Sequence, residues 1–179
     1  MGFEKISLKG RALRYLAARE HSRRELEQKL QAHEETPGEL AQVLDELEAK
    51  GYIQAQRVID SVLFRRAARW GAARVRQELQ SKGLAGEAVQ AALATLKESE
   101  QARARALWER RFGGTASDLQ ARAKQTRFLL ARGFSAEVVR RVVNSRREDD
   151  SSSGHEASAL SDNRGLTNVA TPFGFSDEN

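Results

Sequence analysis

Apolar residues recur every three or four positions through most of the chain, the spacing that places them along one side of an α-helix. Residues 40–47 and 138–143 are two clear cases. Glycines and clusters of polar residues interrupt the pattern at intervals. The chain is therefore predicted to be all-α, with nine helices that include residues 8–19, 55–70, 86–97 and 99–112.

Short sequence signals mark where two of these helices begin. Ser22 and Glu25 form a capping box, in which the hydroxyl and the carboxylate each accept a hydrogen bond from the other residue's backbone N–H. Thr36 and Glu39 repeat the spacing around Pro37, and proline suits the first turn of a helix. The second and third helices are predicted to begin at these two places.

The helices recur as units. Lys82-Gly83-Leu84 matches Arg132-Gly133-Phe134 at an offset of 50, and Glu25-Leu26 matches Glu78-Leu79 at an offset of 53. Self-similarity at such a period is typical of helical repeat proteins. The sequence therefore predicts an elongated array of three tandem three-helix units, followed by a disordered acidic tail; the ranges are 1–53, 54–97, 98–147 and, for the tail, 148–179.

The formal charge of +5 is distributed unevenly along the chain. Residues 1–60 carry 10 basic and 11 acidic residues, a net charge of −1, whereas residues 61–147 carry 19 and 7, a net charge of +12. Residues 148–179 carry 1 and 7, a net charge of −6. Because like charges repel, the basic region is expected to face a polyanion or an acidic protein surface. A well-solvated helical surface is the alternative.

The residues that usually carry enzyme chemistry are missing or scattered. The chain has no cysteine, which excludes disulfides and thiolate metal sites. His21, His33 and His155 lie far apart, and neither a glycine-rich phosphate loop nor a metal-ligand spacing occurs. We therefore expect a protein that is not an enzyme, with no catalytic residues, metal or cofactor. No apolar run approaches the roughly 20 residues that cross a bilayer, so a cytoplasmic location without a membrane partner is expected.

Basic candidates gather around the end of the fourth predicted helix. Arg65 and Arg69 are four residues apart and would share one helix face, which favours docking over ordinary surface charge. Arg66 falls inside the apolar arc of the same helix. It is therefore expected to lie near an open helix end or to point into a groove.

The next helix divides its arginines between two directions. Arg74 and Arg76 differ by about 200° around the helix axis and cannot both face one ligand, so one of them is expected to be structural, with Arg74 pairing with Glu78. Trp70 and Phe112 end equivalent helices, and packing between units is expected ahead of stacking on bases. The candidate partner- or DNA-binding residues are Arg65, Arg66, Arg69, Arg74, Arg76, Lys82, Arg110, Arg111, Lys124, Arg127, Arg132, Arg140 and Arg141.

Five segments, in this order along the chain, carry a family likeness: residues 12–16, 19–30, 47–53, 71–84 and 124–135. Together they resemble the RecX family of bacterial regulators of the RecA recombinase, and the resemblance covers about residues 8–145. After Gly51-Tyr52-Ile53 the family usually places two acidic residues, where this chain has Gln54 and Ala55. A capping role at the start of the fourth helix is therefore not carried over. The acidic tail has no counterpart in the family pattern.

The resemblance implies a non-enzymatic modulator, expected to be a monomer, that lies along the groove of the RecA–single-stranded DNA filament. There it would inhibit filament growth, ATP turnover and strand exchange, and so modulate DNA repair, recombination and the SOS response. A helix-turn-helix-like DNA-binding module is the alternative. The acidic face of the third predicted helix, with Asp45, Glu46 and Glu48, counts against it because it would repel phosphates. A scaffold is a third possibility.

Overall fold

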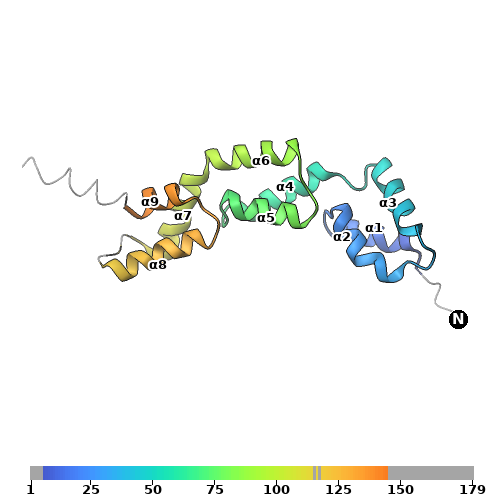
Figure 1. Ribbon diagram of the computed structural model, residues 1–179, viewed down its shortest axis with the longest axis horizontal. Helices are drawn as coiled ribbons and strands as arrows, with labels where there is room; N and C mark the ends of the chain where they lie inside the picture. The colour runs from blue at the N-terminus through green and yellow to red at the C-terminus, as the bar shows by residue number, and fades with distance from the viewer. Residues whose placement is uncertain (1–5, 115, 117, 145–179) are drawn as a thin grey trace, which may run out of the picture. The chain divides into compact units, whose positions relative to one another are not determined.

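The computed structural model describes residues 6–114, 116 and 118–144. The chain divides after Arg146 into two compact parts, and the described residues all belong to the first. The predicted disorder of residues 148–179 lies outside the described residues. Within them, every regular element is helical (Figure 1). The elements are α1 (Leu8–Ala18), α2 (Arg23–Leu30), the short 3₁₀ helix η1 (Gln31–His33), α3 (Glu39–Ala49), α4 (Ala55–Arg66), α5 (Ala72–Ser81), α6 (Glu87–Glu98), α7 (Glu100–Phe112), α8 (Leu119–Leu130) and α9 (Ala136–Asn144).

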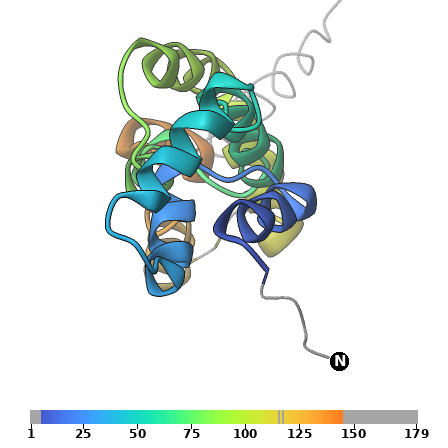
Figure 2. The ribbon, with the colours of Figure 1, turned by 90° about the vertical axis from the view of Figure 1, so that its right-hand side faces the viewer.

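The helices form three units, each with its own hydrophobic core. In the first unit, α3 packs against α1 and α2, as Figure 2 shows, and fully buried leucines such as Leu26, Leu30 and Leu44 fill the space between them. The second unit, α4–α6, encloses Val62 and Leu79 among others. The third unit, α7–α9, has a separate core that includes Trp108, Leu129, Phe134 and Val142. The predicted all-α fold of three tandem three-helix units is thus confirmed.

The capping box at the start of α2 is present as predicted. The Ser22 backbone N–H donates to Glu25 Oε2 at 3.0 Å, and the Glu25 N–H donates to Ser22 Oγ at 3.2 Å. Each bond satisfies an amide that the first turn of a helix leaves without a partner. At α9, Ser135 Oγ likewise accepts from the Val138 N–H at 3.3 Å.

The predicted start of α3 is wrong. No side-chain cap from Thr36 is formed; the helix begins after Gly38, whose φ of 88° is in the left-handed region. Glu34 Oε1 instead accepts from the N–H groups of Gly38 at 2.9 Å and Leu40 at 3.1 Å. The Glu34 carboxylate therefore takes the place of the expected Thr36 hydroxyl. Its negative charge also interacts favourably with the positive N-terminal end of the helix dipole.

The fourth helix is shorter than predicted, and its end changes how its arginines are placed. It stops at Arg66, and residues 67–69 form a turn, so Arg69 lies beyond the helix and does not share a helical face with Arg65. Arg66 sits at the open end, as expected. At the other end, Gln54 provides no side-chain cap, in line with the missing acidic residues.

The two junctions between units repeat one contact. A Cβ atom on Gly83 would approach the Arg24 side chain to 3.0 Å, and one on Gly133 would approach the Arg74 backbone N to 2.6 Å. In both cases the glycine follows the arginine by 59 positions. Each pair therefore marks an equivalent place in the repeat, where a glycine turn after one helix meets the second helix of the preceding unit. Both glycines have positive φ, 76° and 78°.

Candidate basic interface

Two arginines of the second unit flank one tryptophan. Trp70 lies in the short connection between α4 and α5, half-buried against the core of its own unit. The guanidinium carbon of Arg66 is 4.6 Å from the centre of its ring, and that of Arg74 is 4.8 Å away, both within cation–π distance. Glu78 pairs with Arg66 at 3.1 Å, rather than with Arg74 as predicted. Arg74 therefore forms no ion pair with the Glu78 carboxylate.

An equivalent arrangement exists in the third unit. The guanidinium of Arg132 lies 3.6 Å from the centre of the Phe128 ring, and its Nη1 donates to the Phe128 carbonyl at 3.0 Å. The Phe128 ring meets Phe112 edge-on, with 5.1 Å between centroids, and Arg111 lies 6.0 Å from the Phe112 ring. Trp70 and Phe112 thus each pack on the core of their own unit, and the expected packing between units stays a prediction.

The two groups lie next to each other. The pKa of Arg132 is lowered, mainly because the group is partly buried, and further because the positive charges of Arg111 and Arg74 are near it. We call the combined set the arginine–aromatic cluster; it consists of Arg66, Trp70, Arg74, Arg111, Phe112, Phe128 and Arg132. Four guanidinium groups therefore gather on three aromatic rings, and one carboxylate, that of Glu78, pairs with one of them.

Backbone contact between the second and third units holds the cluster together. The Gly71 N–H donates to the Arg132 carbonyl at 2.9 Å, and the Ala73 N–H donates to the Gly133 carbonyl at 3.3 Å. A Cβ atom on Gly71 would lie 2.2 Å from the Gly133 oxygen, so only glycine permits this approach. Because the bonds run between backbones, they fix Arg74 and Arg132 relative to one another independently of side-chain rotamers.

Two side chains of α7, the buried Glu100 and the half-buried Arg103, reinforce the same junction. Glu100 is 5% exposed, and its Oε1 accepts from the Ala72 N–H at 2.9 Å, which caps the first turn of α5. Arg103 Nη1 donates to the carbonyls of Ala67 and, at 2.8 Å, Trp70, at the end of the turn after α4. Burial lowers the pKa of Arg103. The third unit thus supplies both the cap for one helix of the second unit and the donors for the connection that precedes it.

The first junction depends more on side chains. Lys82 Nζ lies 2.6 Å from Glu25 Oε1, and Arg57 lies 3.1 Å from Glu20. Arg19 also donates to Glu25, at 2.9 Å. Burial would raise the pKa of Glu25, but the hydrogen bonds from Arg19, Lys82 and the Ser22 amide outweigh it and lower the pKa to about 2. Lys82, predicted to bind a partner, is therefore committed to an internal ion pair, with 12% of its side chain exposed.

The remaining predicted residues are not part of the arginine–aromatic cluster. Arg65 is exposed, and its Nε donates to the Ser61 carbonyl at 3.0 Å. Arg76 is half-buried, and its Nε has no hydrogen-bond partner in the described part, so the expectation that one member of the Arg74–Arg76 pair is structural stays a prediction. Arg141 pairs with Glu137. The structure leaves the others exposed: Arg69, Arg110, Lys124, Arg127 and Arg140.

Sequence reasoning missed three residues of this region. Phe128 carries Arg132, yet its place in an apolar helix face predicts only a core role. Glu100 and Arg103 look like ordinary surface charges at the start of a helix. A usable signal was available for Gly133, because the repeat aligns it with Gly83. No local pattern indicates a side chain whose partners lie about 30 residues away in another unit.

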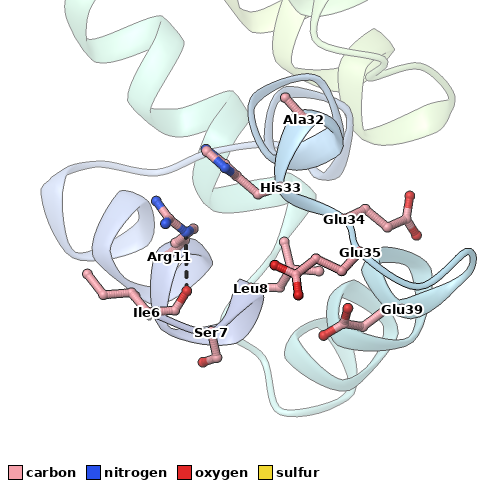
Figure 3. Close-up of a pocket in the computed structure, with 9 residues that line it drawn as sticks. All are labelled: Ile6, Ser7, Leu8, Arg11, Ala32, His33, Glu34, Glu35 and Glu39. Atoms are coloured by element: carbon pink, nitrogen blue, oxygen red, sulfur yellow. Dashed lines mark hydrogen bonds between the residues drawn. The ribbon is translucent and has the colours of Figure 1, made fainter. Parts of the chain in front are cut away.

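The described residues offer little for other chemistry. A hollow of about 280 Å³ lies in the first unit between the start of α1 and the η1–α3 segment (Figure 3). Arg11 and His33 face it from one side and Glu35 from the other, and Arg11 Nε donates to the Ile6 carbonyl at 3.2 Å. Its charges are mixed, and its Glu34 carboxylate caps α3. Within the described ranges, no three His, Asp or Glu side chains gather as a metal site, and no helix is long and apolar enough to cross a membrane.

Comparison with protein families matches each unit separately. The models for the first, second and third three-helix domains of RecX match residues 9–47, 62–93 and 98–143. The regulatory protein RecX of Leptothrix cholodnii is 53% identical over 138 residues, which cover 77% of this chain and 88% of the relative. That of Ralstonia nicotianae is 49% identical over 138 residues, 77% and 87% of the two chains.

Solved structures agree on the fold. The crystal structure of RecX from Lactobacillus salivarius superposes with a TM-score of 0.63 at 18% identity, covering 79% of this chain and 95% of that one. A second crystal structure of regulatory protein RecX gives 0.64 at 20% identity, covering 79% and 71%. At these identities the likeness concerns the fold alone, whereas the curated relatives and the three domain matches decide the family. The chain belongs to the RecX family of regulatory proteins.

Proposed function

We propose that this protein binds the RecA–single-stranded DNA filament and inhibits recombinase and ATPase activity, thereby modulating DNA repair and recombination. It acts in the cytoplasm as a monomer and without catalysis of its own. The observation that carries the proposal is the arginine–aromatic cluster at the junction of the second and third units. It offers a preformed cationic surface in a family whose members are named regulatory proteins.

The chemistry of the cluster fits an anionic assembly. Arginine stays protonated, and its planar fork matches phosphate and carboxylate groups in pairs of hydrogen bonds. Ring contacts restrict the arginines before any partner arrives, so less side-chain entropy is lost on binding. The backbone bonds of the junction hold two units in register. A partner that lies across both units would therefore meet a fixed surface.

A sequence-reading DNA-binding module is less well supported. On the outer face of α3, Asp45 and Glu48 both accept from Arg23, and Glu46 accepts from two lysines. Hydrogen bonds from Lys50 and Lys9 lower the pKa of Glu46 to about 2, so it stays ionised. Because these carboxylates engage Arg23, Lys9 and Lys50, the three basic side chains are not free to hold the phosphates that flank a base-reading helix. Binding that discriminated strongly between duplex sequences would favour this alternative.

ATP hydrolysis by RecA on single-stranded DNA, with the protein titrated in, tests the proposal. Inhibition at amounts comparable to RecA is expected for the wild-type chain. The variant Arg74→Glu with Arg132→Glu is expected to inhibit far less. The matched variant Arg14→Glu with Lys97→Glu, which reverses two exposed charges on other helices, is expected to inhibit nearly as well as wild type. Absence of inhibition by the wild-type protein would overturn the proposal.

A further inference from the structure

Three of the four guanidinium groups in the arginine–aromatic cluster have no ion-pair partner among the described residues. Arg66 has a carboxylate partner, Glu78, at 3.1 Å. For Arg74, Arg111 and Arg132 the described residues show ring contacts and one backbone acceptor, but no ion pair. Burial lowers the pKa of Arg132, and the nearby positive charges of Arg111 and Arg74 lower it further. Like charges placed this close oppose folding, so an external anion would relieve the repulsion.

Two features show that the charges are held in place. Arg132 is fixed between the Phe128 ring at 3.6 Å and the Phe128 carbonyl at 3.0 Å. Arg74 stands on the helix whose first turn is bonded to the carbonyls of Arg132 and Gly133. Ring packing and backbone hydrogen bonds therefore hold these guanidinium groups close together. Ordinary surface arginines are not held in this way.

We propose that Arg74, Arg111 and Arg132 form a clamp for consecutive phosphates of single-stranded DNA, at the junction of the second and third units. This inference rests on the proposed function and assigns the cluster to the DNA strand of the filament and not to the recombinase. A phosphodiester strand carries one charge per nucleotide at short, regular spacing, so it neutralises neighbouring guanidiniums together. A protein carboxylate offers one charge at a time.

The rings of the cluster support backbone recognition over base recognition. The Trp70 ring already has two guanidiniums within 4.8 Å, and the Phe128 ring has Arg132 on it and Phe112 against it. Base stacking needs a free aromatic face. The rings therefore serve as supports for the arginines, and binding is independent of base sequence.

Salt dependence of oligothymidine binding tests the clamp directly. Fluorescence anisotropy of a short labelled strand, measured with the full chain across a salt series, gives the slope of log K against log salt. Each phosphate contact contributes about 0.7 to that slope for a single strand. Arg74→Gln with Arg132→Gln is therefore expected to weaken binding several-fold and to reduce the slope by about 1.4. Arg14→Gln with Lys97→Gln removes the same charge elsewhere and is expected to leave the slope almost unchanged.

Two further variants separate charge from folding. Arg74 is exposed and forms no hydrogen bond through its side chain in the described residues, so Arg74→Gln alone is expected to fold and to reduce the slope by about 0.7. Phe128→Leu keeps every charge but removes the ring under Arg132, and it is expected to weaken binding while the slope falls by less than in the double variant. A slope that is unchanged in both arginine variants overturns the inference.

The nature of the ligand is tested with modified competitors. Oligothymidine with a methylphosphonate backbone keeps its bases and loses its charges, so it is expected not to compete. Oligo-adenine is expected to compete as well as oligothymidine does. Equal competition by the methylphosphonate strand, or by polyglutamate, would overturn the phosphate clamp in favour of base stacking or of an acidic protein surface.

Failure of this inference is distinguishable from failure of the proposed function. If the wild-type protein inhibits RecA while Arg74→Gln with Arg132→Gln binds oligothymidine normally, the clamp is wrong and the proposed function stands. If the wild-type protein leaves RecA unaffected but the double variant loses oligothymidine binding, the proposed function is wrong and the clamp stands.

Discussion

Replacement of Gly71 by alanine tests whether the close backbone approach holds the basic cluster together. The φ of Gly71 is −77°, a value that alanine adopts freely, so the substitution introduces no backbone strain of its own. Its Cβ atom, however, would lie 2.2 Å from the oxygen and 2.3 Å from the carbonyl carbon of Gly133. Ordinary contacts between such atoms are about 3.5 Å, so the second and third units must separate by roughly 1 Å.

The cost follows from the bonds that this separation breaks. The hydrogen bonds from Gly71 N–H at 2.9 Å and Ala73 N–H at 3.3 Å both cross the junction. Each contributes about 0.5–1.5 kcal/mol, and leaving their groups buried without partners adds about 1–2 kcal/mol. Alanine also restricts the unfolded chain, which offsets about 0.4–1 kcal/mol. A net loss of about 1–4.5 kcal/mol in the free energy of unfolding is expected.

Urea denaturation followed by circular dichroism measures this loss, and hydrogen exchange locates it. In Gly71→Ala, exchange at the amides of residues 71 and 73 is expected to accelerate, while the first unit stays protected. Gly38→Ala is the control for stability: its φ of 88° makes alanine strained, but a Cβ atom there meets nothing within 4 Å. It is expected to destabilise the chain without affecting the junction. Unchanged stability and exchange in Gly71→Ala would refute the reasoning.

Three other predictions concern the charged side chains that organise the helices. Glu25 has a pKa of about 2 against an ordinary value of 4.5, so its stabilising effect is complete above pH 4.5 and is lost as the pH falls towards 2. Lys82→Met is therefore expected to lower the urea midpoint at pH 6 and to make it less sensitive to acidification to pH 3 than the wild type; equal sensitivity would contradict this. Glu34→Ala is expected to lower the free energy of unfolding by about 1 kcal/mol, and Thr36→Ala is expected to change it very little. If thermal melts showed the larger loss for Thr36→Ala, the Thr36 hydroxyl and not Glu34 would be the cap. Glu100→Leu is expected to cost about 1–3 kcal/mol by leaving a buried amide without an acceptor, whereas Glu100→Gln, which keeps an acceptor oxygen, is expected to cost less; equal losses would rule out the cap.

Local signals in the sequence predicted most of the fold. The helix positions follow from apolar spacing, and the α2 cap follows from two residues three positions apart. Where prediction failed, a more distant group had replaced a local one. Glu34 displaced Thr36 at α3 because its longer side chain reaches two amides of the first turn. The fourth helix ended early where Arg103 of another unit bonds the carbonyls of the turn that follows it.

The candidate site was predicted only as a region. Charge counting placed the basic surface in the second and third units, and the arginines of the arginine–aromatic cluster were all among the candidates. The sequence could not separate them from the other candidates. Arg74 and Arg132, for example, are 58 positions apart. The sequence also does not distinguish a basic residue that forms an internal ion pair, as Lys82 does, from one that packs on an aromatic ring, as Arg132 does.

Spacing, capping and charge are properties of neighbouring residues, so the amino-acid sequence was enough to predict most of the helices, the three-unit repeat and the positive charge of the second and third units. Which arginines lie together follows from the tertiary structure alone. That choice depends on the contact between the turn at Gly133 and the start of α5, where two backbones meet closely enough to exclude a single methyl group. Such a contact is fixed by the packing of whole units, and no short segment of the chain specifies it.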